Sequence, residues 1–261
     1  MKIMVGLILM AATAAPVAAG DQSLQQVLKS GELRIATEPG YQPWIWQKGR
    51  EGEWTGFEYD FIAFITDHIS KQAGGVPLKP TIRNGTWDSL PNDVVQGKAD
   101  LLLNAYFLPG KNEVKAGQAW SQCYYNTGLR IMYHKNLGRE PTVQDLKGSG
   151  KVGIFTDQHA IDTLTALGVK FKQDDKDNLF DQYIAKKRFD FIVYDAPAAQ
   201  WKVTNGKFKG EVLASKAFVS GSEGCYAIMV KQDSKTLLDA INKALDDLAK
   251  VRPGMLAKYG L

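Results

Sequence analysis

The stretch VVQGKADLLLNA, residues 94–105, has a counterpart in YIAKKRFDFIVYDA, residues 183–196. In each stretch a segment with helical character ends in basic residues, an aspartate follows (Asp100, Asp190), and three apolar residues typical of a strand come next. A helix followed by an apolar strand is the repeating unit of an α/β sheet covered on both faces. Two such stretches predict two lobes of the same construction.

The elements around these two stretches alternate in the same order. Apolar runs bounded by glycine and proline indicate strands, and apolar residues at helical spacing indicate helices. In the first half we expect helices at 23–31, 57–75 and 87–97 and strands at 33–37, 77–84 and 99–105. In the second half we expect helices at 157–168 and 178–188 and strands at 151–155, 169–173 and 189–197. The predicted fold class is therefore α/β.

Two segments connect the halves. Residues 120–134 are predicted to be extended, and residues 224–231 to form a strand that runs back. Two crossings predict a two-stranded hinge with a cleft between the lobes, which is a favoured place for a ligand. The last predicted helix, 234–250, carries an apolar face that should pack on the first lobe. That face consists of Leu237, Leu238, Ile241, Leu245 and Leu248.

The N-terminus, residues 1–20, has the composition of a secretory signal peptide. Lys2 precedes an apolar run and small residues ending in VAA, which predicts cleavage near Ala19 or Gly20 and export of the mature chain. No later segment approaches the length of a membrane span, so we expect a soluble mature protein. The formal net charge of +4 is mild and argues against a nucleic-acid partner.

An aromatic segment follows the first predicted strand. TEPGYQPWIWQ, residues 37–47, holds two prolines and a glycine, which disfavour helix and central strand and predict a loop. Loops lie at the surface, and clustered exposed rings usually have a partner. Glu38, Tyr41, Trp44 and Trp46 are therefore candidates to contact a ligand. The alternative is that the loop folds its rings back onto the core.

Stretches along nearly all of the mature chain match one protein family in order. They are GELRIATEPGYQPW, GEWTGFEYDFIAFI, WDSLPNDVVQGKADLLLN, YYNTG, DLKGSGKVGI, FDFIVYDAPAA and LLDAINKALDDL. With them the chain resembles the periplasmic solute-binding proteins of polar amino-acid ABC transporters. The resemblance implies a type 2 periplasmic-binding-protein fold, in which each lobe is a mixed sheet flanked by helices. It assigns residues 21–125 with 225–261 to lobe 1 and residues 126–224 to lobe 2.

The resemblance also implies a function. The protein would be a monomeric periplasmic receptor that closes on an amino-acid-like or amine solute and delivers it to an inner-membrane ABC permease. Neither enzyme activity nor a cofactor is implied. One alternative is a lyase similar to cyclohexadienyl dehydratases, with Glu38 or Asp195 as a cleft acid. The other is a subunit that signals the presence of ligand to a partner protein. The identity of the ligand stays open.

The resemblance assigns several ligand contacts by position. Tyr41 and Trp87 fall where the family places aromatic rings on the ligand, and Asp195 falls where an aspartate pairs with its α-amino group. A carboxylate at a cleft also suits an ammonium group that leaves water. The family's arginine for the α-carboxylate is replaced by Lys111 in LPGK, residues 108–111. Lysine lacks the planar fork with which arginine binds a carboxylate.

The two sides of the expected site therefore differ. The family's glycine-threonine cradle for the carboxylate is replaced by TDQHA, residues 156–160, so this contact is expected to be weakened or rebuilt from Lys111, Gln158 and the amides near His159. The cation side is expected to be an aromatic cage with acids. Its candidate members are Glu38, Tyr41, Trp44, Trp87, Tyr106, Tyr194 and Asp195. For Trp44 the alternative is a core-facing position, which the family often fills with phenylalanine.

The cysteines, the histidines and one glycine-rich stretch have simpler interpretations. Cys123 and Cys225 suit a disulfide in an oxidising compartment, and the resemblance places them beside the hinge strands. A nucleophilic cysteine is the competing idea, but no histidine is placed to activate it. The three histidines lack metal-ligand spacing, so no metal is expected. GSGKVG, residues 148–153, precedes its strand and is interpreted as a turn, not a dinucleotide site.

Overall fold

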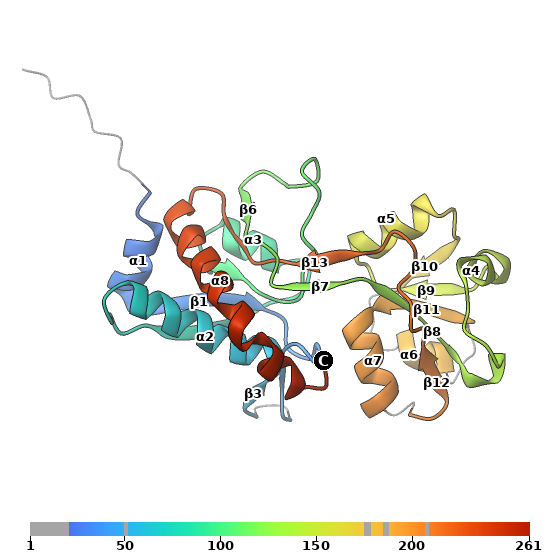
Figure 1. Cartoon of the computed structure of the whole chain (residues 1–261). Helices are drawn as coiled ribbons and strands as arrows, with labels where there is room; N and C mark the ends of the chain where they lie inside the picture. The colour runs from blue at the N-terminus through green and yellow to red at the C-terminus, as the bar shows by residue number, and fades with distance from the viewer. Residues whose placement is uncertain (1–20, 50–51, 175–178, 185–187, 207–208) are drawn as a thin grey trace, which may run out of the picture.

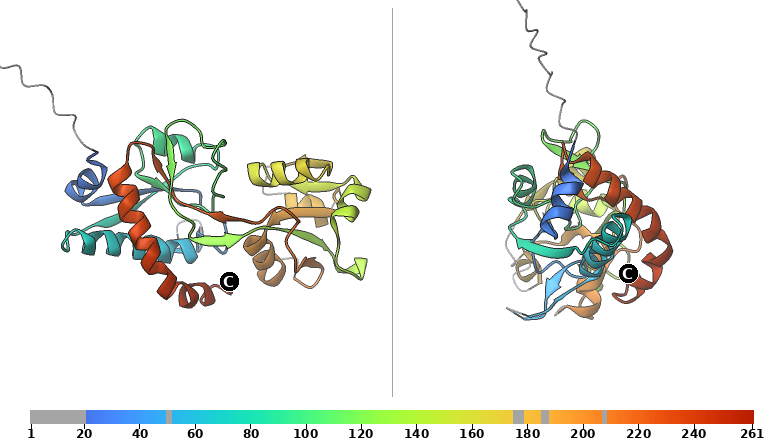
Figure 2. Two further views of the ribbon diagram at one scale, coloured as in Figure 1. Left: turned by 45° about the horizontal axis from the view of Figure 1, so that its top comes forward. Right: turned by 90° about the vertical axis from the view of Figure 1, so that its left-hand side faces the viewer.

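The computed structural model describes residues 21–49, 52–174, 179–184, 188–206 and 209–261. The predicted signal peptide, residues 1–20, lies outside the described residues, as does part of the helix predicted at 178–188. Figure 1 shows two lobes side by side with two extended segments running between them. The left view of Figure 2, turned by 45°, shows the lobes following one another along the long axis of the molecule, and the right view looks along that axis.

The first lobe contains a five-stranded mixed sheet in the order β4-β1-β5-β14-β6. Its strands are β4 (Lys79–Asn84), β1 (Glu32–Thr37), β5 (Leu101–Leu102), β14 (Met229–Lys231) and β6 (Gln118–Trp120). β4, β1 and β5 are parallel, and β14 is antiparallel to both β5 and β6. The chain therefore leaves this sheet after β6 and returns to it with β14.

The second lobe repeats this construction. Its sheet has the order β10-β9-β11-β8-β12, formed by β10 (Phe171–Gln173), β9 (Val152–Ile154), β11 (Phe191–Asp195), β8 (Leu129–His134) and β12 (Val212–Ala214). β10, β9 and β11 are parallel, and β8 is antiparallel to β11 and β12. The two similar stretches of the sequence supply the third strand in each order, β5 and β11. Two lobes of the same construction, as the sequence predicts, are confirmed.

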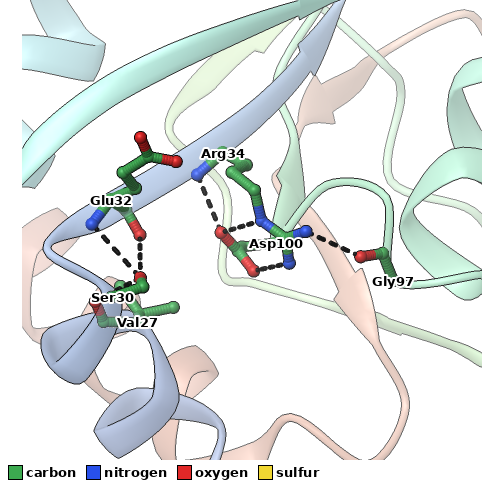
Figure 3. A network of polar contacts seen from close by, with 6 residues as sticks. All are labelled: Val27, Ser30, Glu32, Arg34, Gly97 and Asp100. Atoms are coloured by element: carbon green, nitrogen blue, oxygen red, sulfur yellow. Dashed lines mark hydrogen bonds and ion pairs between the residues drawn. The ribbon is translucent and has the colours of Figure 1, made fainter.

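The aspartate before β5 ties two strands of the first sheet together. The Arg34 guanidinium on β1 donates to both carboxylate oxygens of Asp100, at 2.6 Å from Nη2 to Oδ1 and 3.1 Å from Nε to Oδ2. The backbone N–H of Arg34 donates to Oδ2 at 2.7 Å, and its Nη1 donates to the carbonyl of Gly97 at 2.9 Å (Figure 3). These bonds hold the turn from helix to strand against β1.

Helices cover both faces of the first sheet. α1 (Ser23–Ser30), α2 (Phe57–Gln72) and α8 (Lys235–Ala257) bury apolar side chains with Leu33 and Ile35 of β1. On the other face α3 (Leu90–Val95) packs against Ala36, Leu102 and Met229. Alternate residues of β1 thus point to opposite faces, as the pleat of a strand requires.

The second sheet is covered in the same manner. α4 (Val143–Ser149) and α5 (Gln158–Ala166) pack on the face that carries Phe191 and Val193 of β11. α6 (Leu179–Ile184) and α7 (Ala196–Asn205) pack on the face that carries Ile192. Each lobe thus has its own apolar core, and the surface between the lobes is left for polar and aromatic side chains.

The two crossing segments pair as a hinge. β7 (Tyr125–Thr127) and β13 (Gly224–Tyr226) are antiparallel, with Cys225 opposite Asn126. Cys123 and Cys225 form a disulfide with their Cα atoms 5.7 Å apart, so the predicted pairing is confirmed. The order of sheets agrees with the predicted two lobes, whereas the lobe limits 21–125 with 225–261 and 126–224 remain a prediction.

Most elements lie within a few residues of their predicted positions. The helices α4 and α7 were not predicted, and neither were the short strands β6 and β12 or the hairpin of β2 (Trp46–Gln47) and β3 (Trp54–Thr55). The last helix continues seven residues beyond its predicted end at 250 and contains Pro253. Its final turn is retained because Met255 and Leu256 pack against the core of the first lobe.

Two further properties concern the described residues alone. None of the helices in that part of the chain is both long and apolar enough to cross a membrane. The same residues contain no group of three or more histidine, cysteine, aspartate or glutamate side chains arranged to hold a metal ion.

Candidate ligand-binding site

A cavity of about 420 Å³ lies where the two lobes meet, and we call it the interlobe cavity. This volume is in the range of small-molecule sites. Most of its wall comes from residues just beyond the carboxyl ends of β1, β4, β5, β9 and β11, the usual position of ligand sites in α/β sheets. It is lined by Glu38, Pro39, Gly40, Tyr41, Thr86, Trp87, Asp88, Asn104, Phe155, Thr156, Asp157, Phe180, Tyr194 and Lys202.

Aromatic rings from both lobes form much of this wall. Tyr41 meets Trp87 edge-on with 6.3 Å between ring centroids, and it meets Tyr194 of the second lobe at the same distance. Tyr194 in turn contacts Phe155 at 4.9 Å and Phe180 at 5.4 Å. The rings hold one another at defined angles, so they present a preformed apolar surface to a ligand.

The acids of the wall come from both lobes. Glu38 follows β1, and its Oε2 accepts a hydrogen bond from the backbone N–H of Trp87 at 3.0 Å. Asp157 begins α5, where one carboxylate oxygen accepts from the N–H of His159 at 2.8 Å. Burial raises the pKa of Asp157 above its usual value. Asp88 is the most exposed of the three. Together they make the cavity attractive to a cation.

Lys202 is the basic residue of the wall among the residues that the structure describes. It lies on α7, seven positions after Asp195, so two helical turns bring it alongside the cavity. Its ammonium nitrogen is 4.4 Å from the centroid of the Phe180 ring. The second lobe thus contributes one cation, Lys202, and one acid, Asp157, to the wall.

Asp195 lies behind this wall at a junction of the two lobes. Its carboxylate accepts hydrogen bonds from the Tyr41 hydroxyl at 3.2 Å, the Trp44 indole at 3.3 Å and the backbone N–H of Ala198 at 3.3 Å. The Tyr226 hydroxyl donates to its other oxygen. Asp195 is only 2% exposed, and burial raises its pKa to about 7. In this arrangement its polar partners are protein groups.

A second buried acid supports the segment that follows β5. Glu58, on α2, accepts hydrogen bonds from the backbone N–H of Ala105 at 2.6 Å and from the Tyr124 hydroxyl. Its other oxygen, Oε2, is buried and has no hydrogen-bond partner among the described residues, and burial raises the pKa of Glu58 to about 7. Ala105 has a φ of 52°, and Tyr106, the next residue, stacks on Trp87 at 3.9 Å. Glu58 therefore holds the backbone that positions a ring of the wall.

The structure brings together part of the predicted site. Glu38, Tyr41, Trp87 and Tyr194 line the interlobe cavity. Tyr106 does not line it but stacks directly behind Trp87, because its hydroxyl donates to the Trp87 carbonyl.

Two predicted members lie in the interior instead of on the wall. Trp44 is fully buried, and its ring packs edge-on against Phe57, Tyr125 and Tyr226. This is the core-facing alternative that the sequence left open. Asp195 is buried, and its carboxylate is occupied by the hydrogen-bond donors described above. Trp44 and Asp195 therefore both support the wall from behind.

The predicted carboxylate contacts also fall outside the wall. Lys111 is exposed on a turn closed by a hydrogen bond from the Gly110 N–H to Glu113 at 2.8 Å. Gln158 is exposed and donates to Asp162 at 2.8 Å. His159 stacks on Phe107 at 3.9 Å, and its Nε2 lies 2.8 Å from the Ser222 carbonyl, so it joins the lobes beside the hinge.

Sequence reasoning missed several wall residues. Asp157 had a local signal, because an aspartate between a strand and a helix suits an N-cap whose carboxylate lies at the strand's carboxyl end. Phe155 also had a local signal, because it lies at the carboxyl end of a predicted strand, and Asp88 directly follows Trp87, which was predicted to contact the ligand. Phe180 and Lys202 had no such signal, since they come from helices and reach the cavity only through the packing of α6 and α7.

The fold and the cavity together define a two-lobed solute-binding protein. The sequence profile of the bacterial extracellular solute-binding proteins, family 3, matches residues 33–252. The chain belongs to this family. The type 2 periplasmic-binding-protein fold expected from the resemblance is thereby confirmed.

Curated relatives in this family carry the names of amino-acid receptors. The L-cystine-binding protein TcyJ of Escherichia coli (strain K12) is 28% identical over 237 residues, covering 89% of this chain and 83% of the relative. The histidine-binding periplasmic protein of the same strain is 25% identical over 228 residues, covering 83% and 82%.

A solved structure similar in fold is that of the ancestral amino acid-binding protein AncCDT-1, described as a precursor of cyclohexadienyl dehydratase. It superposes with a TM-score of 0.75 at 19% identity and covers 91% of this chain and 98% of its own. At this identity the likeness establishes the fold alone.

Proposed function

We propose that this protein is an exported receptor that binds a small cationic or zwitterionic solute, an amino acid or an amine, and delivers it to an ABC permease. The observation that carries the proposal is the wall of the interlobe cavity, where Glu38, Asp88 and Asp157 accompany five aromatic rings. We further propose that the protein acts as a monomer.

The chemistry of this wall favours a positive charge. An ammonium group that leaves water must be paired with an anion or with several acceptors, and the carboxylates supply them. The faces of Trp and Tyr rings add an electrostatic attraction of about 0.5–2 kcal/mol for a cation that lies over them. The same carboxylates would repel a purely anionic solute.

Membership of the family supports transport over catalysis. The relatives' names describe binding of cystine and histidine, and the family is defined by solute binding. A lyase would need an acid free to transfer a proton to the ligand. Asp195, one of the two acids considered for that role, is sealed behind the wall by four donors. Glu38, the other acid, lines the cavity, so our proposal that the protein does not turn over its ligand rests chiefly on membership of the family.

The test is a binding panel on the mature chain. Each amino acid is paired with its decarboxylated amine, cystine and quaternary ammonium compounds are added, and thermal shift is followed by calorimetric titration. A ligand at a hundred times its Kd should add about 2.7 kcal/mol of stability, or roughly 5–10 °C in melting temperature. Glu38→Gln should weaken the binding of any cationic ligand. Glu140→Gln, at an exposed glutamate outside the cavity wall, serves as the matched control because glutamine keeps an acceptor for the N–H groups of Lys216 and Ala217.

Three results would overturn the proposal. A silent panel would remove the amino-acid and amine classes. A preference for anionic solutes would contradict the charge of the wall. Mass spectrometry of recovered ligand distinguishes a receptor from a lyase, because a receptor returns the ligand unchanged.

A further inference from the structure

The interlobe cavity has an uneven distribution of charge. Glu38 and Asp88 come from the first lobe, and Asp157 and Lys202 from the second. Among the described wall residues Lys202 is the basic one, and it lies on a different element from every acid. A ligand with a cationic group and an anionic group can contact both the acids and the lysine of such a wall, whereas a simple amine offers no anionic group to attract the lysine.

Lys202 has a defined position on this wall. It lies on α7, and its ammonium nitrogen is 4.4 Å from the centroid of Phe180. Phe180 is 5% exposed and packs edge-on against Tyr194, so the surface under the lysine is rigid. The ammonium group thus lies over an aromatic ring, which is a favourable position for a cation, and Lys202 is part of the cavity wall.

The other basic candidate is badly placed. Lys111, which the resemblance assigns to the position of a carboxylate-binding arginine, is exposed and does not line the cavity. Its loop is closed by the Gly110–Glu113 hydrogen bond, which turns this segment on itself.

We propose that Lys202 binds the anionic group of the ligand and that the preferred ligand is therefore zwitterionic. This proposal rests on the proposed function and adds a residue and a ligand class to it. The carboxylate contact is moved from the first lobe to the second, so the two charged ends of the ligand bind both lobes. Closure then depends on the ligand carrying both charges.

The experiment compares affinities for an amino acid and its decarboxylated amine in charge variants. Histidine with histamine and arginine with agmatine are suitable pairs, measured by isothermal titration. Lys202→Met keeps the length of the side chain and removes the charge, and Lys202→Arg restores it. Lys170→Met, at an exposed lysine of the second lobe outside the cavity wall, is the matched control, and Lys111→Met tests the competing position. Melting curves verify that each variant folds.

We expect Lys202→Met to weaken amino-acid binding about 10- to 100-fold, the loss typical of a charged hydrogen bond, with the amine affinity unchanged or higher. Lys202→Arg should keep the amino-acid preference, and the other two variants should remain within twofold of the parent.

Each contrary outcome has a separate meaning. If the parent protein binds amines as tightly as amino acids, or if Lys111→Met removes the preference and Lys202→Met does not, the assignment of Lys202 fails while the proposed function stands. If the parent binds no member of either pair or of the wider panel, the proposed function fails and takes this inference with it.

Discussion

Two tryptophans of this protein show how much a single residue's environment decides. Trp44 is fully buried. Its ring lies in the core of the first lobe, and its indole N–H donates a hydrogen bond to Asp195. Trp87 lies on the cavity wall and stacks on Tyr106. The first ring should therefore serve stability and the second should serve binding.

The two rings make a matched pair of substitutions. Trp44→Ala should lower the free energy of unfolding by about 3–5 kcal/mol, because it empties a fully buried site. Trp87→Ala should cost about 1.5 kcal/mol or less, the value of a lost ring stack, and should weaken ligand binding more than tenfold. Urea unfolding and titration calorimetry separate the two effects. Equal losses of stability in both variants would contradict the assignment.

Two buried carboxyl groups, Glu58 and Asp195, should make the stability of the fold depend on pH. Burial raises the pKa of Glu58 from 4.5 to about 7 and that of Asp195 from 3.8 to about 7. In both cases the folded protein binds the proton more tightly than the unfolded chain does. The stabilisation is therefore complete below the unfolded pKa and is lost as the pH rises through about 7.

We expect the protein to lose stability between pH 5 and pH 7, by up to about 1.4 kcal/mol per pH unit for each of the two groups. Glu58→Gln keeps an acceptor for the Ala105 N–H and removes one of the two titrating groups. The loss of stability per pH unit in this variant should therefore be about half that of the parent. Melting temperatures at pH 5, 6, 7 and 8 provide the measurement. Identical slopes for parent and variant would show that Glu58 does not titrate in this range.

At the scale of elements, the bond between Arg34 and Asp100 links β1 to the turn before β5 (Figure 3). The Asp100 side chain is 12% exposed, and that of Arg34 is 33% exposed. A bidentate pair with an additional backbone donor is stronger than an ordinary surface ion pair. It fixes the register of the strand whose carboxyl end leads to the cavity.

Asp100→Asn should therefore lower the free energy of unfolding by about 1–3 kcal/mol, because it removes the charge from three hydrogen bonds. Asp67→Asn is the matched control, since Asp67 forms an exposed helix pair with Lys71 that should contribute under about 0.5 kcal/mol. Urea denaturation of both variants provides the comparison. A loss at Asp67 as large as that at Asp100 would contradict the structural role of this pair.

At the scale of the whole molecule, side-chain contacts join the two lobes in addition to the hinge strands. Asp195 accepts from Tyr41 and Trp44 of the first lobe, Phe107 stacks on His159, and Trp46 meets Trp201 at 6.2 Å. The disulfide holds Cys225 of β13 to Cys123 just before β7. The hinge is thus covalently closed, and movement of one lobe against the other must occur around a fixed pair of strands.

The disulfide closes a loop that contains nearly the whole second lobe, with a sequence separation of 102 residues. In the chain-entropy account, a loop of this length contributes at most about 4.7 kcal/mol. The double variant Cys123→Ser, Cys225→Ser should therefore unfold at a clearly lower urea concentration. A thiol assay on denatured, unreduced parent protein should find none, and two thiols would show that the bond is not formed in solution.

The amino-acid sequence by itself determined the construction of this protein. The repeat of helix, aspartate and apolar strand, the two crossings and the apolar face of the last helix all depend on local periodicity, which a chain carries wherever it folds. The wall residues Glu38 and Tyr41 were also within reach, because they lie in the aromatic loop that follows the first strand, whereas Trp87 was assigned by the resemblance to the family.

Only the tertiary structure decided which charges face the cavity. Asp157 lies on the wall, whereas Gln158 and His159, its neighbours in the chain, do not. Lys202 reaches the wall, and Lys111 does not. The physical reason is that the direction of a side chain at a helix start or on a helix face depends on how separate elements pack. Such packing joins residues far apart in sequence, so no local pattern contains it.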